Sequence, residues 1–381
     1  MKVWFITDMK YPGNDAPCVR IHYLSRIIAL CGHEVCVFGR GKEKKGEYLG
    51  TPFISLRGDS ENKLGLLWHY SMKMSGQFLS AVSKGKPHII ITYNISTSLM
   101  KRLISNQKKY GYRLLNDCVE WYSKEESSPF SLDRVQYHRR NYWMRHILPQ
   151  HTEVIAISKY LEHYFKDLGT KCTYLPSMCD IESMSAEKEI SKDKIVIAYA
   201  GSPGRKDMFA PVILALLGLS ESVRKNLLIR IIGSSREAIA KNAGVSAEQL
   251  NILEDCLEFL PRMSHDAVLE QLEKVDFTIL IRPQNMRYAK AGFPTKVPES
   301  LATGTPVICN LTSDLGDFLV DEENALIAKD ESVESVKDVL QRAIHLTLEQ
   351  REHMCACARK TAEDCFDYRL YTKAMGDFLR R

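Results

Sequence analysis

The chain has 381 residues, 45% of them hydrophobic and 26% charged, with a formal net charge of +5 at pH 7. This composition excludes a disordered or low-complexity chain, and the length suits two domains better than a single core. The charge is uneven: residues 1–180 hold 26 Lys and Arg against 16 Asp and Glu, a net +10, and the remainder holds 26 against 31, a net −5. We therefore expect the first half to face an anionic partner: nucleic acid, anionic lipid or a phosphorylated acceptor.

The cysteines and the N-terminal residues bear on where the protein works. The 11 cysteines are odd in number and include no C-x-x-C pair, a pattern that favours reduced thiols. The apolar-biased start MKVWFITD ends at Asp8, far short of a signal peptide or a membrane span. The sequence therefore predicts a cytoplasmic protein.

Short Val-, Ile- and Leu-rich runs alternate with longer amphipathic ones, as strands and helices do in a parallel sheet. The runs in the first half are Lys2–Thr7, Glu34–Phe38, Pro52–Leu56, His88–Thr92, Tyr112–Leu115 and Glu153–Ile157. Those in the second half are Lys194–Tyr199, Leu227–Ile232, Asp276–Ile281, Thr305–Cys309 and Ala325–Ala328. We predict an α/β protein of two doubly wound, Rossmann-like domains.

A polar, weakly periodic stretch separates the two sets of strands. We place the first domain at residues 1–178, a linker at 179–193 and the second domain at 194–365. Ligands of doubly wound sheets lie beyond the carboxyl ends of the strands, so two such domains that face each other would form an interdomain cleft. The last segment, 366–381, has apolar residues at helical spacing and would, by itself, cap the second domain.

Two carboxylates follow the predicted strand Tyr112–Leu115, at the edge where ligands of the first domain should lie. Asp117 and Glu120 are candidates to orient an acceptor hydroxyl or to accept its proton. The structural alternative is that Asp117 caps a loop and Glu120 is solvated.

Residues 132–148 combine four arginines with aromatic and aliphatic side chains in one predicted helix. Such a helix can lie in a membrane interface, where each basic residue contributes about 1 kcal/mol of attraction to anionic lipid. Packing on its own domain is the alternative. Nucleic acid is not an expected partner, because no recognised binding module occurs. An anionic membrane surface on the cytoplasmic side is thus a candidate partner.

A glycine-rich basic turn follows the first predicted strand of the second domain: Gly201-Ser-Pro-Gly-Arg205-Lys206-Asp. Glycine lets the backbone approach a ligand closely, and the adjacent cations supply donors for a diphosphate. The turn has neither the Walker A nor the G-x-G-x-x-G spacing, so a simple turn before a basic helix start is the alternative. Arg282 follows a later predicted strand and is expected at the same edge of the sheet.

The stretch Ala291–Asn310, AGFPTKVPESLATGTPVICN, reads as a loop, a short helix and a buried strand. Thr295 is a predicted cap of the helix, and Pro298 falls in its first turn, where a missing N–H costs nothing. Gly304 is predicted to end the helix. The free N–H groups at the helix start, together with Lys296, favour a phosphate.

Glu299 lies one turn into this helix, where a carboxylate would repel phosphate. It is better suited to accept hydrogen bonds from sugar hydroxyls such as those of a ribose. Phosphate and sugar together indicate a nucleotide.

The same stretch resembles the donor-site signature of retaining GT-B glycosyltransferases of family 4, in which a glutamate, seven residues and a second glutamate precede a small-residue helix and G-x-P-V-I. Glu299 matches the second glutamate, whereas the first would fall at Ala291, which is not acidic. With AGFPTK the chain more closely resembles a variant group among capsule and exopolysaccharide transferases. In the family the first carboxylate holds donor-sugar hydroxyls, so its absence bears on which sugar is bound.

The resemblance spans nearly the whole chain and implies roles for individual residues. Arg205 and Lys206 would stabilise the leaving nucleoside diphosphate, and Gly13 would belong to a glycine loop that approaches it. The final segment, 366–381, would cross back to pack on the first domain. The expected donor-binding set is completed by Gly201, Arg282, Gly292, Phe293, Pro294, Thr295, Lys296 and Glu299.

We therefore predict a glycosyltransferase that moves a sugar from a nucleotide-sugar donor to a polysaccharide-repeat or lipid-linked acceptor with retention of configuration. No D-x-D motif and no Cys/His cluster occurs, so we expect no metal, and no cofactor besides the donor, which is a substrate. Two alternatives stay open: a nucleotide-sugar epimerase of GT-B fold, and a non-catalytic GT-B partner subunit. The missing acid at Ala291 favours the partner subunit, and the basic turn opposes it.

Overall fold

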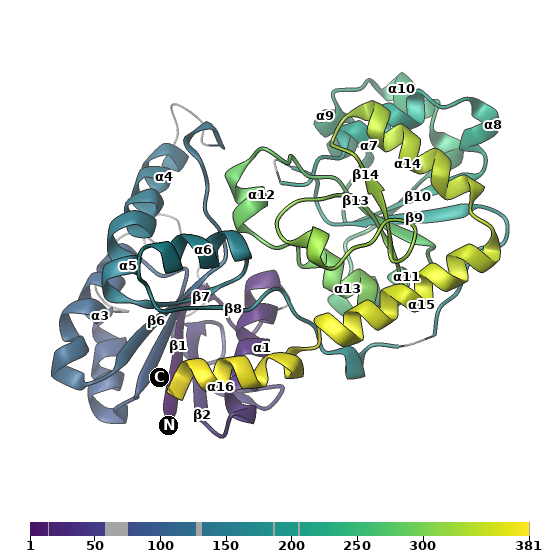
Figure 1. The fold of residues 1–381 in the computed structure, drawn as a ribbon. Coiled ribbons are helices and arrows are strands. Elements are labelled where there is room, and N and C mark those ends of the chain that lie inside the picture. The colour runs from purple at the N-terminus through teal and green to yellow at the C-terminus, as the bar shows by residue number, and fades with distance from the viewer. Residues whose placement is uncertain (14, 58–74, 127–131, 186, 205, 381) are drawn as a thin grey trace. The chain divides into compact units, whose positions relative to one another are not determined.

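The computed structural model describes residues 1–13, 15–57, 75–126, 132–185, 187–204 and 206–380 (Figure 1). The chain divides into two compact units, Met1–Met178 with Tyr368–Arg381, and Cys179–Asp367. Each unit is built on its own largely parallel sheet, which confirms the predicted α/β class with two doubly wound domains.

The sheet of the first unit has eight strands within the described residues, in the order β3-β4-β2-β1-β5-β6-β7-β8. All pairings are parallel except that of β3 with β4, so the edge hairpin departs from the predicted all-parallel sheet. The strands are β1 (Lys2–Lys10), β2 (Glu34–Arg40), β3 (Lys45–Tyr48), β4 (Thr51–Arg57), β5 (Ile89–Tyr93), β6 (Arg113–Cys118), β7 (Glu153–Ala156) and β8 (Cys172–Tyr174). The helices are α1 (Ala16–Leu30), α3 (Thr97–Tyr110), α4 (Leu132–Tyr142), α5 (Leu148–His151), α6 (Lys159–Asp167) and α16 (Thr372–Arg380), with a π-helical stretch at Trp143–Ile147.

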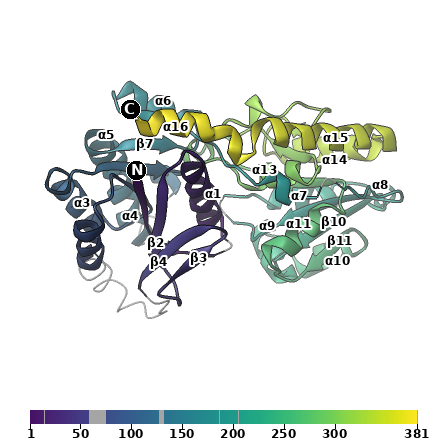
Figure 2. The same ribbon diagram turned by 90° about the horizontal axis from the view of Figure 1, so that it is seen from below.

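Helix α16 packs on the first helix of the chain (Figure 2). Met375 and Phe378 belong to the same buried cluster as Phe5 and Ile21, so α16 completes the core of the first unit. The Cys31 thiol donates to the carbonyl of Thr372 at 3.3 Å, and this contact joins the end of α1 to the start of α16.

The sheet of the second unit is parallel throughout, in the order β11-β10-β9-β12-β13-β14. Its strands are β9 (Ile195–Ala200), β10 (Leu227–Ile232), β11 (Leu257–Leu260), β12 (Phe277–Leu280), β13 (Val307–Asn310) and β14 (Ala325–Ala328). Its helices are α7 (Ala210–Leu217), α8 (Glu221–Arg224), α9 (Arg236–Ala243), α10 (Ala247–Asn251), α11 (His265–Leu272), α12 (Arg287–Ala291), α13 (Lys296–Ala302), α14 (Val333–His345) and α15 (Leu348–Cys365).

The chain leaves β9 on one side, builds β10 and β11, and then returns to the other side of β9 to form β12. The strand order therefore reverses between β9 and β12. In open α/β sheets ligands bind beyond the carboxyl ends of the strands at such a switch point. This geometry directs attention to the loops that follow β9 and β12.

Residues 179–193, the expected linker, are part of the second unit. The N–H of Cys179 donates to the carbonyl of Phe366 at 2.9 Å. Further on, the ammonium of Lys188 donates to Leu272 O at 2.7 Å and to Thr305 Oγ1 at 2.6 Å. Burial of this side chain lowers the pKa of Lys188 to about 8.

Among the helices that the structure describes, none combines the length and the apolar character that crossing a membrane requires.

Candidate functional site

Two loops of the second unit meet at the switch point of its sheet. The loop after β9 begins at Gly201, and Arg282 lies just beyond the end of β12. The N–H of Met208 donates to the carbonyl of Ile281 at 2.7 Å and ties the two loops together. The basic turn and Arg282, which the sequence analysis assigned to one edge, are thus adjacent in space.

A carboxylate lies between the cations of this edge. Asp207 Oδ2 accepts from Lys296 Nζ at 2.5 Å, and its Oδ1 is 3.4 Å from Nε of Arg282. The ammonium of Lys296 also lies 4.6 Å from the centre of the Tyr199 ring, a cation–π distance. Burial, followed by the nearby Asp207 charge, raises the pKa of the Tyr199 hydroxyl. Asp207 was not among the predicted site residues.

Gly201 is required by this arrangement in two ways. Its φ of +135° belongs to a region that L side chains rarely adopt, and a Cβ added there would lie 2.9 Å from Lys296 Nζ. Its N–H donates to the carbonyl of Ile232 at 2.9 Å, and its own carbonyl accepts from the Ser234 hydroxyl at 2.8 Å. The glycine thus fixes the turn and lets the lysine approach the backbone.

Arg282 is held by its backbone and carries unsatisfied donors on its side chain. The Asn310 amide clamps the main chain, accepting from Arg282 N at 2.9 Å and donating to Arg282 O at 2.6 Å. The residue is only 8% exposed, yet its Nε and Nη1 find no hydrogen-bond acceptor within the part of the chain that the structure describes. Buried donors of this kind cost free energy unless they are paired, so they are ready for the anionic oxygens of a ligand.

Glu299 has a partner that the sequence analysis did not find. Its Oε1 lies 3.1 Å from Nε2 of His265, the first residue of α11. The hydrogen bond to Glu299 raises the pKa of His265, against an opposing effect of burial. Ser264, whose hydroxyl accepts from Ala267 N at 3.3 Å, fixes the start of α11 and thereby the histidine. A serine cap followed by histidine was visible in the sequence, but its distance of 34 residues from Glu299 hid the pairing.

The start of α13 differs from expectation in one respect. Thr295 occupies the N-cap position, but its side chain makes no capping hydrogen bond, because its backbone is already in the helical region at φ −63° and ψ −26°. Pro294 instead closes the turn, its carbonyl accepting from Val297 N at 3.3 Å. Gly304 adopts φ +66° just after the helix, as predicted for a helix end.

The loop before α13 is anchored in the core. The Phe293 ring packs 5.8 Å from that of Phe318 and 5.9 Å from that of Phe366, and Phe293 is buried. Gly292 ends α12 with its N–H donating to Tyr288 O at 2.9 Å. Gly292 and Phe293 can therefore contact a ligand only through their backbone atoms.

The other predicted residues of the second unit lie in different surroundings. Arg205 lies outside the described residues, and Lys206 is half-buried in the same turn. Ala291, where the family pattern has a carboxylate, is fully buried in α12. The structure thus brings Lys296 and Arg282 to Asp207, places Gly201 against Lys296, and pairs Glu299 with His265.

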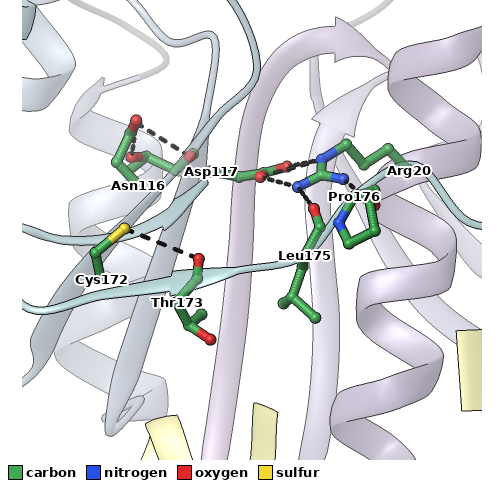
Figure 3. Close-up of polar contacts among 8 residues, drawn as sticks. Arg20, Asn116, Asp117, Cys172, Thr173, Leu175 and Pro176 are labelled. Carbon is green, nitrogen blue, oxygen red and sulfur yellow. Dashed lines mark hydrogen bonds and ion pairs between the residues drawn. The ribbon is translucent and has the colours of Figure 1, made fainter. Parts of the chain in front are cut away.

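Asp117 of the first unit lies inside β6 in a buried ion pair (Figure 3). Its side chain is completely covered, and its two oxygens accept from Nε and Nη2 of Arg20 at 2.8–3.1 Å. The same guanidinium donates to the carbonyls of Leu175 at 3.1 Å and Pro176 at 2.9 Å. Burial raises the pKa of Asp117, and Arg20 opposes this rise. The contacts favour a structural role, and proton transfer by Asp117 stays a prediction.

The other first-unit candidates have local partners. Glu120 accepts from the Tyr122 hydroxyl at 2.6 Å, so it is not the simply solvated side chain of the structural alternative. The N–H of Gly13, in the loop after β1, donates to Cys18 Sγ at 3.0 Å. Within the described residues, no group of three or more His, Cys, Asp or Glu could hold a metal ion.

The two doubly wound domains, together with the solved structures described below, identify the GT-B fold. Residues 180–361, within the second unit, match the model of the family described as glycosyl transferases group 1. No curated protein matches the chain.

Solved structures resemble the chain over almost its whole length. Sucrose-phosphate synthase from Thermosynechococcus elongatus shares 14% identity with a TM-score of 0.74, over 100% of this chain and 98% of that one. HepE from Anabaena, in complex with UDP and glucose, shares 12% identity with a TM-score of 0.69, over 100% and 99%. WaaG, a glycosyltransferase involved in lipopolysaccharide biosynthesis, shares 16% identity with a TM-score of 0.68, over 98% of each chain. These likenesses establish the fold, and the family match supports glycosyl transfer.

Proposed function

We propose that the protein transfers a sugar from a nucleotide-sugar donor to a polysaccharide-repeat or lipid-linked acceptor, with retention of configuration and without a metal. The observation that carries the proposal is the cationic edge of Lys296 and Arg282 at the β9–β12 switch point. This edge belongs to the part of the chain that matches the glycosyltransferase family. HepE, of the same fold, binds UDP-glucose, which supports a nucleotide sugar as the donor.

In the proposed reaction the bond between the sugar and the diphosphate breaks, and negative charge grows on the leaving diphosphate. Donors that are already oriented in a site with little water stabilise such charge most effectively. The buried Nε and Nη1 of Arg282 are donors of this kind, and the partly exposed ammonium of Lys296 adds a positive charge beside them. Arg205 and Lys206 are proposed as further phosphate ligands, on the family resemblance.

The nucleoside is proposed to bind through its ribose. Glu299 would accept hydrogen bonds from the ribose hydroxyls, while its contact with His265 fixes the orientation of the carboxylate. Because retaining transfer in the resembling family needs no protein nucleophile, the departing phosphate itself would take the acceptor proton. The burial of Asp117 against Arg20 agrees with a reaction that uses no carboxylate at that position.

The proposal for the acceptor rests on the positive charge of the first half of the chain. The first half of the chain carries a net +10, which suits a phosphorylated, lipid-linked acceptor or an anionic membrane surface. Within 132–148, Tyr142 is 54% exposed, whereas Met144 is buried, so this helical segment has both an exposed and a packed side. We propose peripheral docking of the exposed side on the cytoplasmic face of a membrane.

A thermal-shift panel of UDP-, GDP-, ADP- and dTDP-sugars tests the proposal. A ligand at about a hundredfold excess over its Kd stabilises the folded state by about 2.7 kcal/mol, which raises Tm measurably. Arg282→Gln should abolish the shift, and Arg236→Gln, on α9 of the same domain, should keep it.

Turnover separates the alternatives once a donor is known. A transferase releases nucleoside diphosphate faster when acceptor is present, whereas an epimerase interconverts donor sugars without acceptor. A non-catalytic subunit gives no turnover under either condition. Failure of every nucleotide sugar and nucleoside diphosphate to raise Tm would refute the proposal.

A further inference from the structure

We propose that Asp207 is an internal competitor for the diphosphate: its carboxylate holds Lys296 and Arg282 while the site is empty and yields them when phosphate oxygens bind. The inference rests on the proposed function, because it concerns the same edge of the second domain. Its consequence is a site that binds nucleoside diphosphate less tightly than its cations alone would allow.

The geometry places Asp207 where a bridging anion would lie. Its Oδ2 takes the ammonium of Lys296 at 2.5 Å, and its Oδ1 faces Nε of Arg282 at 3.4 Å. One carboxylate therefore spans two cations that come from different elements, the start of α13 and the loop after β12. The ammonium of Lys296 also lies 4.6 Å from the centre of the Tyr199 ring, so the ring is a second neighbour of the lysine.

The two halves of this bridge are unequal. The contact with Lys296 is short, whereas the 3.4 Å contact with Arg282 is longer than a good N–H···O bond, and Nε and Nη1 gain no acceptor among the described residues. Asp207 thus neutralises the arginine only in part. A phosphate group has more oxygens and more charge than a carboxylate, so it can offer the guanidinium the short bonds that Asp207 does not.

Displacement of a competing carboxylate offsets part of the free energy that phosphate binding releases. The offset applies equally to donor and to the product nucleoside diphosphate, because both carry phosphate oxygens. Product release limits turnover in many enzymes. If Asp207 returns to Lys296 and Arg282 as the diphosphate leaves, it would speed product release. The rival role is that of a positioning residue, without which Lys296 and Arg282 would move apart and bind anions poorly.

The two roles predict changes of opposite sign in Asp207→Asn, which keeps the shape and removes the charge. Titration calorimetry with inorganic pyrophosphate, and then with the nucleoside diphosphate of the donor, measures the change. We expect about tenfold tighter binding of both. Asp338→Asn, an exposed carboxylate on α14, makes the same change in net charge and should alter the affinity less than about twofold.

A double variant localises the effect. In Asp207→Asn combined with Lys296→Gln, the gain in pyrophosphate affinity should disappear, because the released cation is gone. If Asp207→Asn does not fold, Asp207→Ser removes the same charge and is measured instead. Unchanged or weaker pyrophosphate binding in the folded variant overturns the inference.

The outcomes also separate this inference from the proposed function. If the native protein binds nucleotides and Asp207→Asn binds them no more tightly, the competitor role fails while the donor site stands. If Asp207→Asn gains pyrophosphate affinity but no nucleotide sugar raises Tm, the competitor role stands for an anion site and the transferase proposal fails.

Discussion

Arg20 in the first domain and Arg282 in the second are both buried, and the hydrogen-bonding groups of the two side chains are satisfied differently. Arg20 in the first domain bonds with both oxygens of Asp117 and with two backbone carbonyls. Arg282 in the second domain has one long contact with Asp207, while Nε and Nη1 have no hydrogen-bond acceptor among the described residues. The same side chain thus serves as architecture in one domain and as an incomplete site in the other.

The two arginines occupy comparable places in the strand order, and the difference lies in the groups that surround them. Arg282 follows β12 at the switch point of the second sheet, and Arg20 lies on α1, which follows β1 at the switch point of the first. The carboxylate that binds Arg20 comes from β6, one strand further from that switch point. Backbone carbonyls from the segment after β8 complete the shell of Arg20.

The largest expected effect concerns the satisfied arginine. Arg20→Met leaves the Asp117 charge buried and unpaired, and should lower the free energy of unfolding of the first domain by about 3–5 kcal/mol. All four tryptophans belong to residues 1–178, so urea unfolding followed by tryptophan fluorescence reports on this domain. The double variant Arg20→Met with Asp117→Leu should recover part of the loss. A loss below about 1 kcal/mol would show that the pair is not structural.

The next prediction concerns Arg282, where we expect a loss of binding affinity with little loss of stability. Arg282→Gln should leave stability within about 1 kcal/mol of the native protein, because buried unpaired donors are removed. It should weaken nucleoside diphosphate binding by about 2 kcal/mol, roughly thirtyfold, as measured by calorimetry. Arg282→Lys keeps the charge and should recover part of the affinity. Strong destabilisation with unchanged affinity would make Arg282 architectural too, and the contrast with Arg20 would be lost.

A smaller effect is expected at Glu299. Glu299→Gln removes the charge that accepts from ribose hydroxyls, and should weaken nucleoside diphosphate binding by about 1 kcal/mol, roughly fivefold. The variant should also lose the preference for ribose over 2′-deoxy- and 3′-deoxyribose ligands. Equal binding of ribose and deoxyribose ligands by the native protein would remove Glu299 from the site.

The smallest effect concerns pH. The hydrogen bond to Glu299 raises the pKa of His265 above its ordinary value of about 6.5, so the stabilising contribution of this pair is complete below about pH 6.5 and is lost as pH rises through the folded-state pKa. His265→Gln should therefore cost more stability at about pH 5.5 than at about pH 8.5, although less than about 1 kcal/mol, because the pair is partly exposed. Circular dichroism follows the unfolding, with His345→Gln on α14 as the control. A pH-independent difference would contradict the pairing.

The sequence predicted the fold through its apolar runs. All eleven predicted strands occur in the structure, with ends within three residues, because buried parallel strands must be continuously apolar. The strands β3, β8 and β11 were missed. The first is an exposed, charged edge segment, KGEY, and the other two have only three and four residues, so none carries a clear periodicity.

The sequence predicted the site residues that adjacent strands and helix starts mark, but not the contacts between distant residues. Gly201 and Arg282 were assigned to one edge because each follows a predicted strand, and Lys296 was expected to bind phosphate because it begins a predicted helix. Asp207 and His265 were missed, because a contact across 89 or 34 residues leaves no mark in a single sequence. Asp117 was expected to face a ligand for the same reason. Its partner Arg20 is 97 residues away, so the residues around Asp117 in the sequence do not indicate the pairing.

The packing of α16 on α1 makes the first domain discontinuous in the chain. During translation, α16 leaves the ribosome only after every residue of the second domain. Until then the nascent first domain lacks Met375 and Phe378 and exposes part of its apolar cluster. The second domain can therefore finish folding before α16 completes the first domain. We expect a chaperone to bind the apolar surface that the first domain exposes until then.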